Sequence, residues 1–153
     1  VQTGVRTFEA AAYLRRCGAD ITRIRKIFRE NFKDYQAKAA AISSAEIYRD
    51  AYAFSTIDPK GLESPTVVCA QAANELLNIR GIKASIVLTL YNDIIYVSAR
   101  SIDEMNVQVL MEKLGGGGHR TIAGAQLREG SLPEAIATIK QAIDEMIKEG
   151  EAS

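Results

Sequence analysis

Apolar positions in the first third of the chain recur at helical spacing. This spacing predicts a helix from Phe8 to Arg16 and another, through an alanine-rich run, from about Asp34 to Ser44. Between them a helix begins at Asp20, and its apolar face consists of Ile21, Ile24, Ile27 and Phe28. We interpret residues 1–45 as a helical connector.

After residue 45 the pattern changes to β-rich runs. Ile47 to Ile57 carries aromatic and alternating apolar residues, and it is expected to form one strand. Ala84 to Leu90 and Ile94 to Ala99 predict two further strands, joined at Asn92 and Asp93 in a hairpin turn. Thr121 to Leu127 is expected to form another strand.

Helices are expected between and after these strands. Ser64 and Pro65 are typical of a helix start, and this helix should run to about Asn78 before Gly81 ends it. Asn106 to Leu114 predicts a second helix, because its apolar residues recur at i, i+3, i+4 and i+7. The apolar stripe of a closing helix consists of Leu132, Ile136, Ile139, Ile143 and Ile147.

These elements predict an α+β fold, with a helical connector followed by a mixed β-sheet domain flanked by helices. The change of pattern places the boundary within residues 45–50, so that residues 1–45 form the connector and residues 46–153 the sheet domain. A length of 153 residues, 47% of them hydrophobic and 25% charged, is typical of a soluble globular protein.

The charged residues exclude few classes of function. The formal net charge is zero, but residues 1–60 hold eleven Lys and Arg against seven Asp and Glu. This excess is either a solvated helix face, the simpler interpretation, or a surface that meets a polyanion. Cys17 and Cys69 lie far apart without a C-x-x-C pair, which favours a reducing compartment over a disulfide framework or a structural zinc site.

The sequence contains no run near the roughly 20 apolar residues that a membrane span needs. No secretory signal is present, and the chain opens on Val1 rather than Met. We therefore expect a cytoplasmic piece of a longer protein that makes no membrane contact itself.

Candidate chemistry concentrates in Gly115, Gly116, Gly117, Gly118 and His119. Glycine costs a regular element roughly 0.5–1 kcal/mol relative to alanine, so four in a row suggest a need for close backbone approach or positive φ. Bare amides could converge on an anion, and the sole histidine could donate to a phosphate oxygen. The alternative is a loose helix end. The run matches neither a P-loop nor a dinucleotide fingerprint.

A second candidate is the pair Arg100 and Ser101, at the end of a predicted strand. The forked donors of an arginine suit phosphate, although surface arginines usually pair with carboxylates. The glycine run follows one predicted helix later in the chain, so the two segments could form two walls of one pocket.

The residue inventory is that of a binding module. A single histidine cannot build a two-metal centre, and neither cysteine has a base partner nearby in sequence. We therefore expect no catalytic residue, metal or cofactor in these residues, and no hydrolysis by this chain alone.

The run from Ser98 to Leu127, SARSIDEMNVQVLMEKLGGGGHRTIAGAQL, resembles the DHH-associated C-terminal domain of DHH-family phosphoesterases. The segments TGVRTFEAAAYLRRCGAD and AEIYRDAYA are similar to bacterial membrane-anchored cyclic-di-AMP phosphodiesterases. This resemblance covers essentially the whole chain. It implies a hydrolase in signalling whose associated domain grips the nucleotide opposite a two-manganese centre, so that Mn²⁺ and the DHH domain belong upstream.

Carried over by position, the resemblance implies that Arg100, Ser101 and Gly115–His119 contact the substrate. Arg6 is assigned a phosphate role with less weight. Residues 121–125 depart from the Asn- and Ala-rich version of that branch, which leaves the preferred nucleotide open.

Three functions remain after the resemblance. The first is binding of a cyclic or linear dinucleotide within a cyclic-dinucleotide phosphodiesterase anchored in the membrane. The second is single-stranded nucleic-acid binding for a RecJ-like exonuclease or an oligoribonuclease. Against it stands the lack of a basic excess, because residues 61–153 hold eight Lys and Arg against twelve Asp and Glu. The third is a regulatory or homodimerising domain without a ligand of its own.

Overall fold

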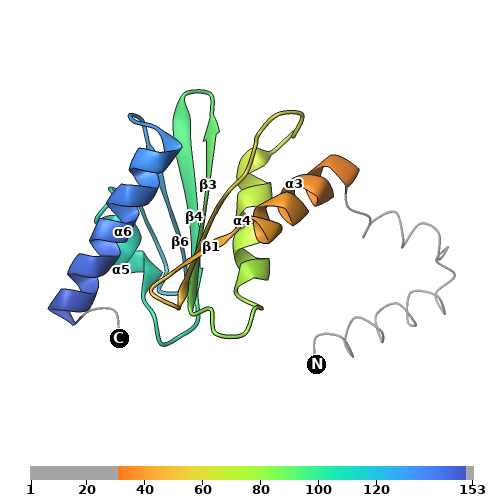
Figure 1. Cartoon of the computed structure of the whole chain (residues 1–153). Coiled ribbons are helices and arrows are strands. Elements are labelled where there is room, and N and C mark those ends of the chain that lie inside the picture. The colour runs from red at the N-terminus through yellow and green to blue at the C-terminus, as the bar shows by residue number, and fades with distance from the viewer. Residues whose placement is uncertain (1–30, 151–153) are drawn as a thin grey trace, which may run out of the picture. The chain divides into compact units, whose positions relative to one another are not determined.

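The computed structural model describes residues 31–150, and those from Phe32 onward belong to one compact unit (Figure 1). The helices predicted within residues 1–30 lie outside the described residues. The described helices are α3 (Phe32–Ser43), α4 (Pro65–Leu76), α5 (Val107–Glu112) and α6 (Leu132–Glu149). None of them is long and apolar enough to cross a membrane.

Six described strands form one sheet in the order β1-β2-β3-β4-β6-β5. Their bounds are β1 (Glu46–Tyr48), β2 (Tyr52–Thr56), β3 (Ala84–Tyr91), β4 (Ile94–Ser101), β5 (Gly117–Gly118) and β6 (Ile122–Leu127). Among them only β2 and β3 pair in parallel, and α4 connects these two strands. The predicted α+β class is confirmed, while the predicted domain boundary at 45–50 stays a prediction.

The predicted β3–β4 hairpin is confirmed. Asn92 and Asp93 have φ of 52° and 63°, the left-handed conformation that a two-residue hairpin turn requires. The prediction of one strand over 47–57 was wrong, because Arg49 and Asp50 also adopt positive φ and fold this segment into the β1–β2 hairpin. The glycine run contributes the edge strand β5, which was not predicted from the sequence.

Helices α5 and α6 lie on one side of the sheet, and α3 and α4 lie on the other (Figure 1). The core under α5 and α6 is the larger of the two, and the predicted stripe of α6 buries Ile139 and Ile143 in it. Ser131 caps α6 by accepting a hydrogen bond from the Glu134 amide, and Gly150 ends the helix in the left-handed conformation. This side of the sheet supplies most of the apolar burial.

The core under α3 and α4 is smaller and contains buried hydroxyl groups. Ser55 Oγ donates to the Ala41 carbonyl of α3 at 2.6 Å, and Ser85 Oγ donates to the Ala73 carbonyl of α4 at 2.6 Å. Cys69 is fully buried in α4, and this burial raises the pKa of its thiol to about 12. Helix α4 contacts β3 and β4 but leaves the same face of β6 open, where Ile122 is 52% exposed.

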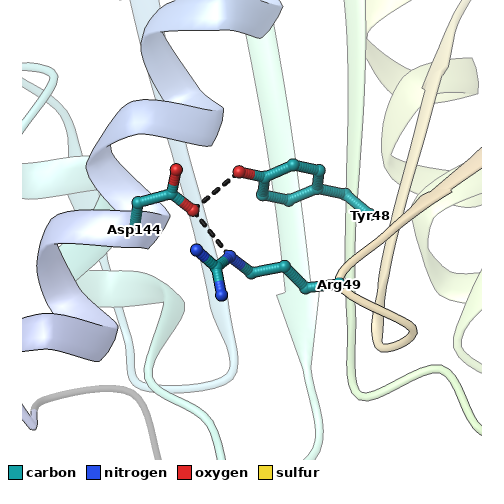
Figure 2. Close-up of polar contacts among 3 residues, drawn as sticks. All are labelled: Tyr48, Arg49 and Asp144. Atoms are coloured by element: carbon teal, nitrogen blue, oxygen red, sulfur yellow. Dashed lines mark hydrogen bonds and ion pairs between the residues drawn. The ribbon is translucent and has the colours of Figure 1, made fainter.

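A polar clamp joins the β1–β2 turn to the last helix (Figure 2). Tyr48 Oη and Arg49 Nε both donate to Asp144 Oδ1, at 2.6 and 2.7 Å. These hydrogen bonds, from Tyr48 first and Arg49 second, hold the pKa of the Asp144 carboxyl below its ordinary value of 3.8. The Lys140 ammonium lies 5.2 Å from the centroid of the Tyr48 ring, close enough for a cation–π contact.

Candidate functional site

The glycine run begins as the end of α5. Gly115 adopts φ +83°, and its amide donates to the Glu112 carbonyl, while the Gly116 amide donates to the Met111 carbonyl at 2.8 Å. This pattern is a helix end closed by a left-handed glycine. The helix-end interpretation therefore holds for the first part of the run.

Gly116 and Gly118 are required by close approach to β6. A Cβ at Gly116 would lie 2.1 Å from the Gly124 carbonyl oxygen, and a Cβ at Gly118 would lie 2.5 Å from the Ile122 carbonyl oxygen. Gly118 also has φ +145°, which side chains rarely adopt. These two glycines serve the fold itself.

Gly117 is different. A Cβ there would meet no protein atom within 4 Å, and its φ lies outside the left-handed region. The positive φ angles of the run occur at Gly115 and Gly118. A Cβ at Gly115 would also meet open space, but Gly115 has positive φ, so Gly117 is the one glycine of this run that neither a close contact nor a positive φ requires.

The expected nest of free amides is only partly available. The amides of Gly115 and Gly116 close α5, and the His119 amide donates to the Ile122 carbonyl at 2.7 Å. Gly117 and Gly118 remain, in the short ladder with β6. A bound anion would therefore meet at most two amides of this loop.

Arg100 lies on β4 with its side chain toward α4. Its Nε donates to Asn74 Oδ1 of α4 at 2.9 Å, and its Nη1 donates to the Ala99 carbonyl. Burial lowers the pKa of this half-buried guanidinium, and no carboxylate among the described residues forms an ion pair with it. A cation that is partly desolvated without a carboxylate partner is suited to bind an anion.

Ser101 does not share the environment of Arg100. Successive residues of a strand point to opposite faces, so Ser101 is buried on the side of α5 and α6. Its Oγ hydrogen-bonds to the carbonyl oxygens of Met105 and Arg120, at 3.0 and 3.3 Å. The structure gives this hydroxyl a role in holding the loop before α5, away from Arg100.

The strand register aligns the remaining candidates on the face toward α4. Arg100 is opposite Ile122, whose carbonyl accepts from the His119 amide. Two residues back along β4, Ser98 is opposite Gly124, and Gly124 is opposite Gly117. Side chains of directly opposed residues share a face, so Gly124 and Gly117 form a floor of bare backbone beside Ser98.

An open groove lies beside this floor. Its lining comes from α4, β4, the glycine run and β6, and consists of Thr66, Tyr96, Val97, Gly115, Gly116, Gly124, Ala125, Gln126 and Arg128. Tyr96, Gln126 and Arg128 were not predicted from the sequence. The i, i+2 alternation from Arg100 back along β4 could have indicated Tyr96, whereas Gln126 required the register between β4 and β6.

Two expectations concern residues beyond this groove. Arg6 lies outside the described residues. Within residues 31–150 no three His, Cys, Asp or Glu side chains gather where they could hold a metal ion. The described residues therefore do not fit a metal centre.

With this geometry established, residues 49–149 match the DHHA1 domain family, and the chain belongs to it. The chain is 43% identical to the cyclic-di-AMP phosphodiesterase PdeA of Listeria monocytogenes, over 94% of this chain and 22% of that protein. It is 39% identical to the cyclic-di-AMP phosphodiesterase GdpP of Geobacillus thermodenitrificans, over 98% of this chain and 23% of that protein. It thus spans about a fifth of the length of these relatives.

The fold has a solved counterpart. An exopolyphosphatase-related protein from Bacteroides fragilis superposes with a TM-score of 0.70 at 20% identity, over 92% of this chain and 43% of that chain. This likeness shows the fold alone. The resemblance to the DHH-associated domain of DHH-family phosphoesterases is confirmed.

Proposed function

We propose that the chain is the substrate-contacting module of a cyclic-dinucleotide phosphodiesterase and binds one phosphodiester beside Arg100. The observation that carries this proposal is the guanidinium of Arg100, half-buried and without a carboxylate partner among the described residues. Asn74 Oδ1 and the Ala99 carbonyl accept two of its N–H groups, which leaves the other donors of the planar fork for an anion. The names of the relatives support a cyclic dinucleotide as the substrate class.

In this proposal the floor of the site allows the phosphate to approach closely. Gly117 and Gly124 present no side chains, so a ligand can reach the backbone of the β5–β6 ladder. His119 is exposed, and its amide donates to the carbonyl of Ile122, the register partner of Arg100, so we assign its imidazole the part of a further donor. Thus Arg100 provides the charge, Gly117 the space and His119 a directional hydrogen bond.

Catalysis would come from elsewhere in the longer protein. The described residues offer no metal-binding cluster, so we place the manganese centre in a DHH domain upstream, within a membrane-anchored protein whose catalytic part is cytoplasmic. This module would then face that centre and hold the substrate against it. The isolated chain is expected to show no hydrolysis of cyclic or linear dinucleotides, with or without Mn²⁺.

The test compares KM in a protein that joins this chain to its DHH domain. Arg100→Ala should raise KM for cyclic-di-AMP by roughly one to two orders of magnitude, because a lost hydrogen bond to a charged group is worth about 1.5–3 kcal/mol. Gly117→Ala should raise KM to a similar extent, because its Cβ would occupy the space through which the phosphate approaches the backbone. Arg120→Ala is the matched control, since this exposed arginine donates to the Asp103 carbonyl outside the groove. It should leave KM unchanged.

Two outcomes would contradict the proposal. A lower melting temperature with unchanged KM in the Gly117→Ala variant would make that glycine purely structural. Titration of the 153-residue chain with cyclic-di-AMP, its linear product and a short oligonucleotide tests the competing function. Binding of the oligonucleotide alone would favour a nucleic-acid-binding module.

A further inference from the structure

The groove contains an aromatic side chain that the apolar core does not use. Tyr96 lies between Ile95 and Val97, which are buried under α5 and α6, so its ring is on the opposite face of β4. That face is only partly covered by α4, and Tyr96 remains part-exposed as a lining residue of the groove. An aromatic ring at the open wall of a polar groove is available for stacking.

An amide lies directly across from this ring. Gln126 of β6 is the register partner of Tyr96, it is exposed, and it also lines the groove. Directly opposed side chains on one face of an antiparallel pair have Cβ atoms about 4.5–5.5 Å apart. A flat ligand stacked on the Tyr96 ring would therefore present its edge to the Gln126 amide.

The distance from Tyr96 to the glycine floor suits a nucleotide, because this floor lies midway along β4 between Tyr96 and Arg100, which are about 13 Å apart. Tyr96 precedes Ser98 by two residues, and Ser98 lies in the same row of the sheet as Gly124 and Gly117. Two residues of a strand span about 6.6 Å, within the reach of one nucleotide from its phosphate to its base. A phosphate on the glycine floor would thus place an attached base near Tyr96.

We propose that Tyr96 and Gln126 form a nucleobase subsite selective for adenine, an inference that rests on the function proposed above. Every base has a π face that can stack on an aromatic ring, so Tyr96 supplies affinity with little discrimination. A glutamine amide both donates and accepts, which matches N7 and the N6 amino group of adenine. Guanine presents two acceptors there, O6 and N7, which suit arginine or lysine instead.

Arg128 supports a competing assignment of this subsite, to guanine. It lines the same groove two residues after Gln126, beyond the end of β6 at Leu127. A guanidinium there could bind guanine O6 and N7, which would reverse the preference. The position of Gln126 directly opposite Tyr96, within the ladder, favours adenine.

The experiment measures KM for cyclic-di-AMP and cyclic-di-GMP in the protein that joins this chain to its DHH domain. Tyr96→Ala should raise KM about tenfold for both substrates, and Tyr96→Phe should restore it, because the ring rather than the hydroxyl stacks. Gln126→Glu should raise KM about tenfold for cyclic-di-AMP alone, because a carboxylate cannot donate to N7. Gln141→Glu, on the exposed surface of α6, is the matched control.

The outcomes separate this inference from the proposed function. If Arg100→Ala and Gly117→Ala raise KM while Tyr96→Ala and Gln126→Glu do not, the subsite is wrong and the proposed function stands. If none of the four variants changes KM, both fail. A loss of discrimination in Arg128→Ala, with Gln126→Glu silent, would overturn the assignment to adenine. Melting temperatures of all variants identify any change that comes from unfolding.

Discussion

The two faces of the sheet use the same strands for different purposes. On β4, Ile95, Val97 and Ala99 are buried against α5 and α6, while Tyr96 and Arg100 lie on the face toward α4. The face toward α5 and α6 is covered completely along β4. The face toward α4 is covered over β3 and β4 but is open over β6. Because alternate residues of one strand serve stability and binding, a single-residue shift of register would exchange the two sets.

The open face differs from the covered one in side-chain size as well as in cover. Large aliphatic side chains fill the core under α5 and α6, whereas Gly117 and Gly124 leave the open face flat. A flat stretch of backbone that no helix covers admits a ligand. Substitutions on the covered face should therefore change stability, and those on the open face should change binding.

The largest difference in stability is expected between two variants that each lack one aliphatic side chain, one on each face of the sheet. Ile95→Ala should lower the free energy of unfolding by about 2–5 kcal/mol, because Ile95 is 1% exposed and leaves a cavity. Ile122→Ala should change it by no more than about 0.5 kcal/mol, since Ile122 is half-exposed on the open face. Urea unfolding of both variants measures the difference, and equal losses would contradict the comparison.

A smaller effect is expected when a methyl group is added to the glycine run. Gly116→Ala should destabilise the fold by about 1–3 kcal/mol, since its Cβ would collide with the Gly124 carbonyl and Ala125. Gly117→Ala is the matched variant, and its melting temperature should stay close to that of the original chain. Thermal unfolding followed by circular dichroism distinguishes them, and a stable Gly116→Ala protein would show that β5 can move away from β6.

The two serines of β4 lie on different faces of the sheet, so their substitution separates effects on stability from effects on binding. Ser101→Ala should cost about 0.5–1.5 kcal/mol of stability and leave KM unchanged, because its buried hydroxyl bonds only to protein carbonyls. Ser98→Ala, on the open face, should leave stability unchanged. A higher KM with unchanged stability in Ser101→Ala would restore this residue to the substrate contacts that the sequence predicts.

The smallest effect concerns the clamp between Tyr48, Arg49 and Asp144. The pKa of Asp144 is lower in the folded chain than its ordinary value of 3.8, so its contribution is present above that value and is lost as pH falls through the folded pKa. The melting temperature of Asp144→Ala should be a few degrees lower at pH 7. The difference should disappear at acid pH, below the lowered folded pKa of this carboxyl. A difference that persists there would mean that the clamp does not depend on the carboxylate.

Much of the fold follows from local patterns. The stripe of α6 and the hairpin at Asn92 and Asp93 are strong signals, because their spacing and turn residues agree with the tertiary structure. The β1–β2 turn was missed because Arg49 and Asp50 are not glycines and interrupt a run of otherwise strand-like residues. Strand β5 was missed because glycines carry no side chains whose alternation could indicate a strand.

The candidate site was predicted only in part, because it depends on strand register as well as on local patterns. Arg100 and the glycine run are separated by one short helix, and the sheet brings them to one face. Ser101 was grouped with Arg100, whereas neighbouring residues of a strand face opposite ways and the alternation separates the two side chains. A substrate contact of Ser101 stays a prediction. Tyr96 and Gln126 could not be paired from the sequence, because their contact depends on which residues of β4 and β6 lie opposite.

The buried thiol of Cys69 makes it possible to measure how often α4 detaches from the sheet. With a pKa of about 12 and no exposed surface, it is protonated and unreactive at neutral pH while α4 is docked on the sheet. An alkylating reagent can reach it only during a transient detachment of the helix that carries Asn74, the partner of Arg100. In a Cys17→Ser background, the rate of alkylation therefore reports how often this wall of the groove comes away. A dinucleotide held between α4 and the sheet would slow it.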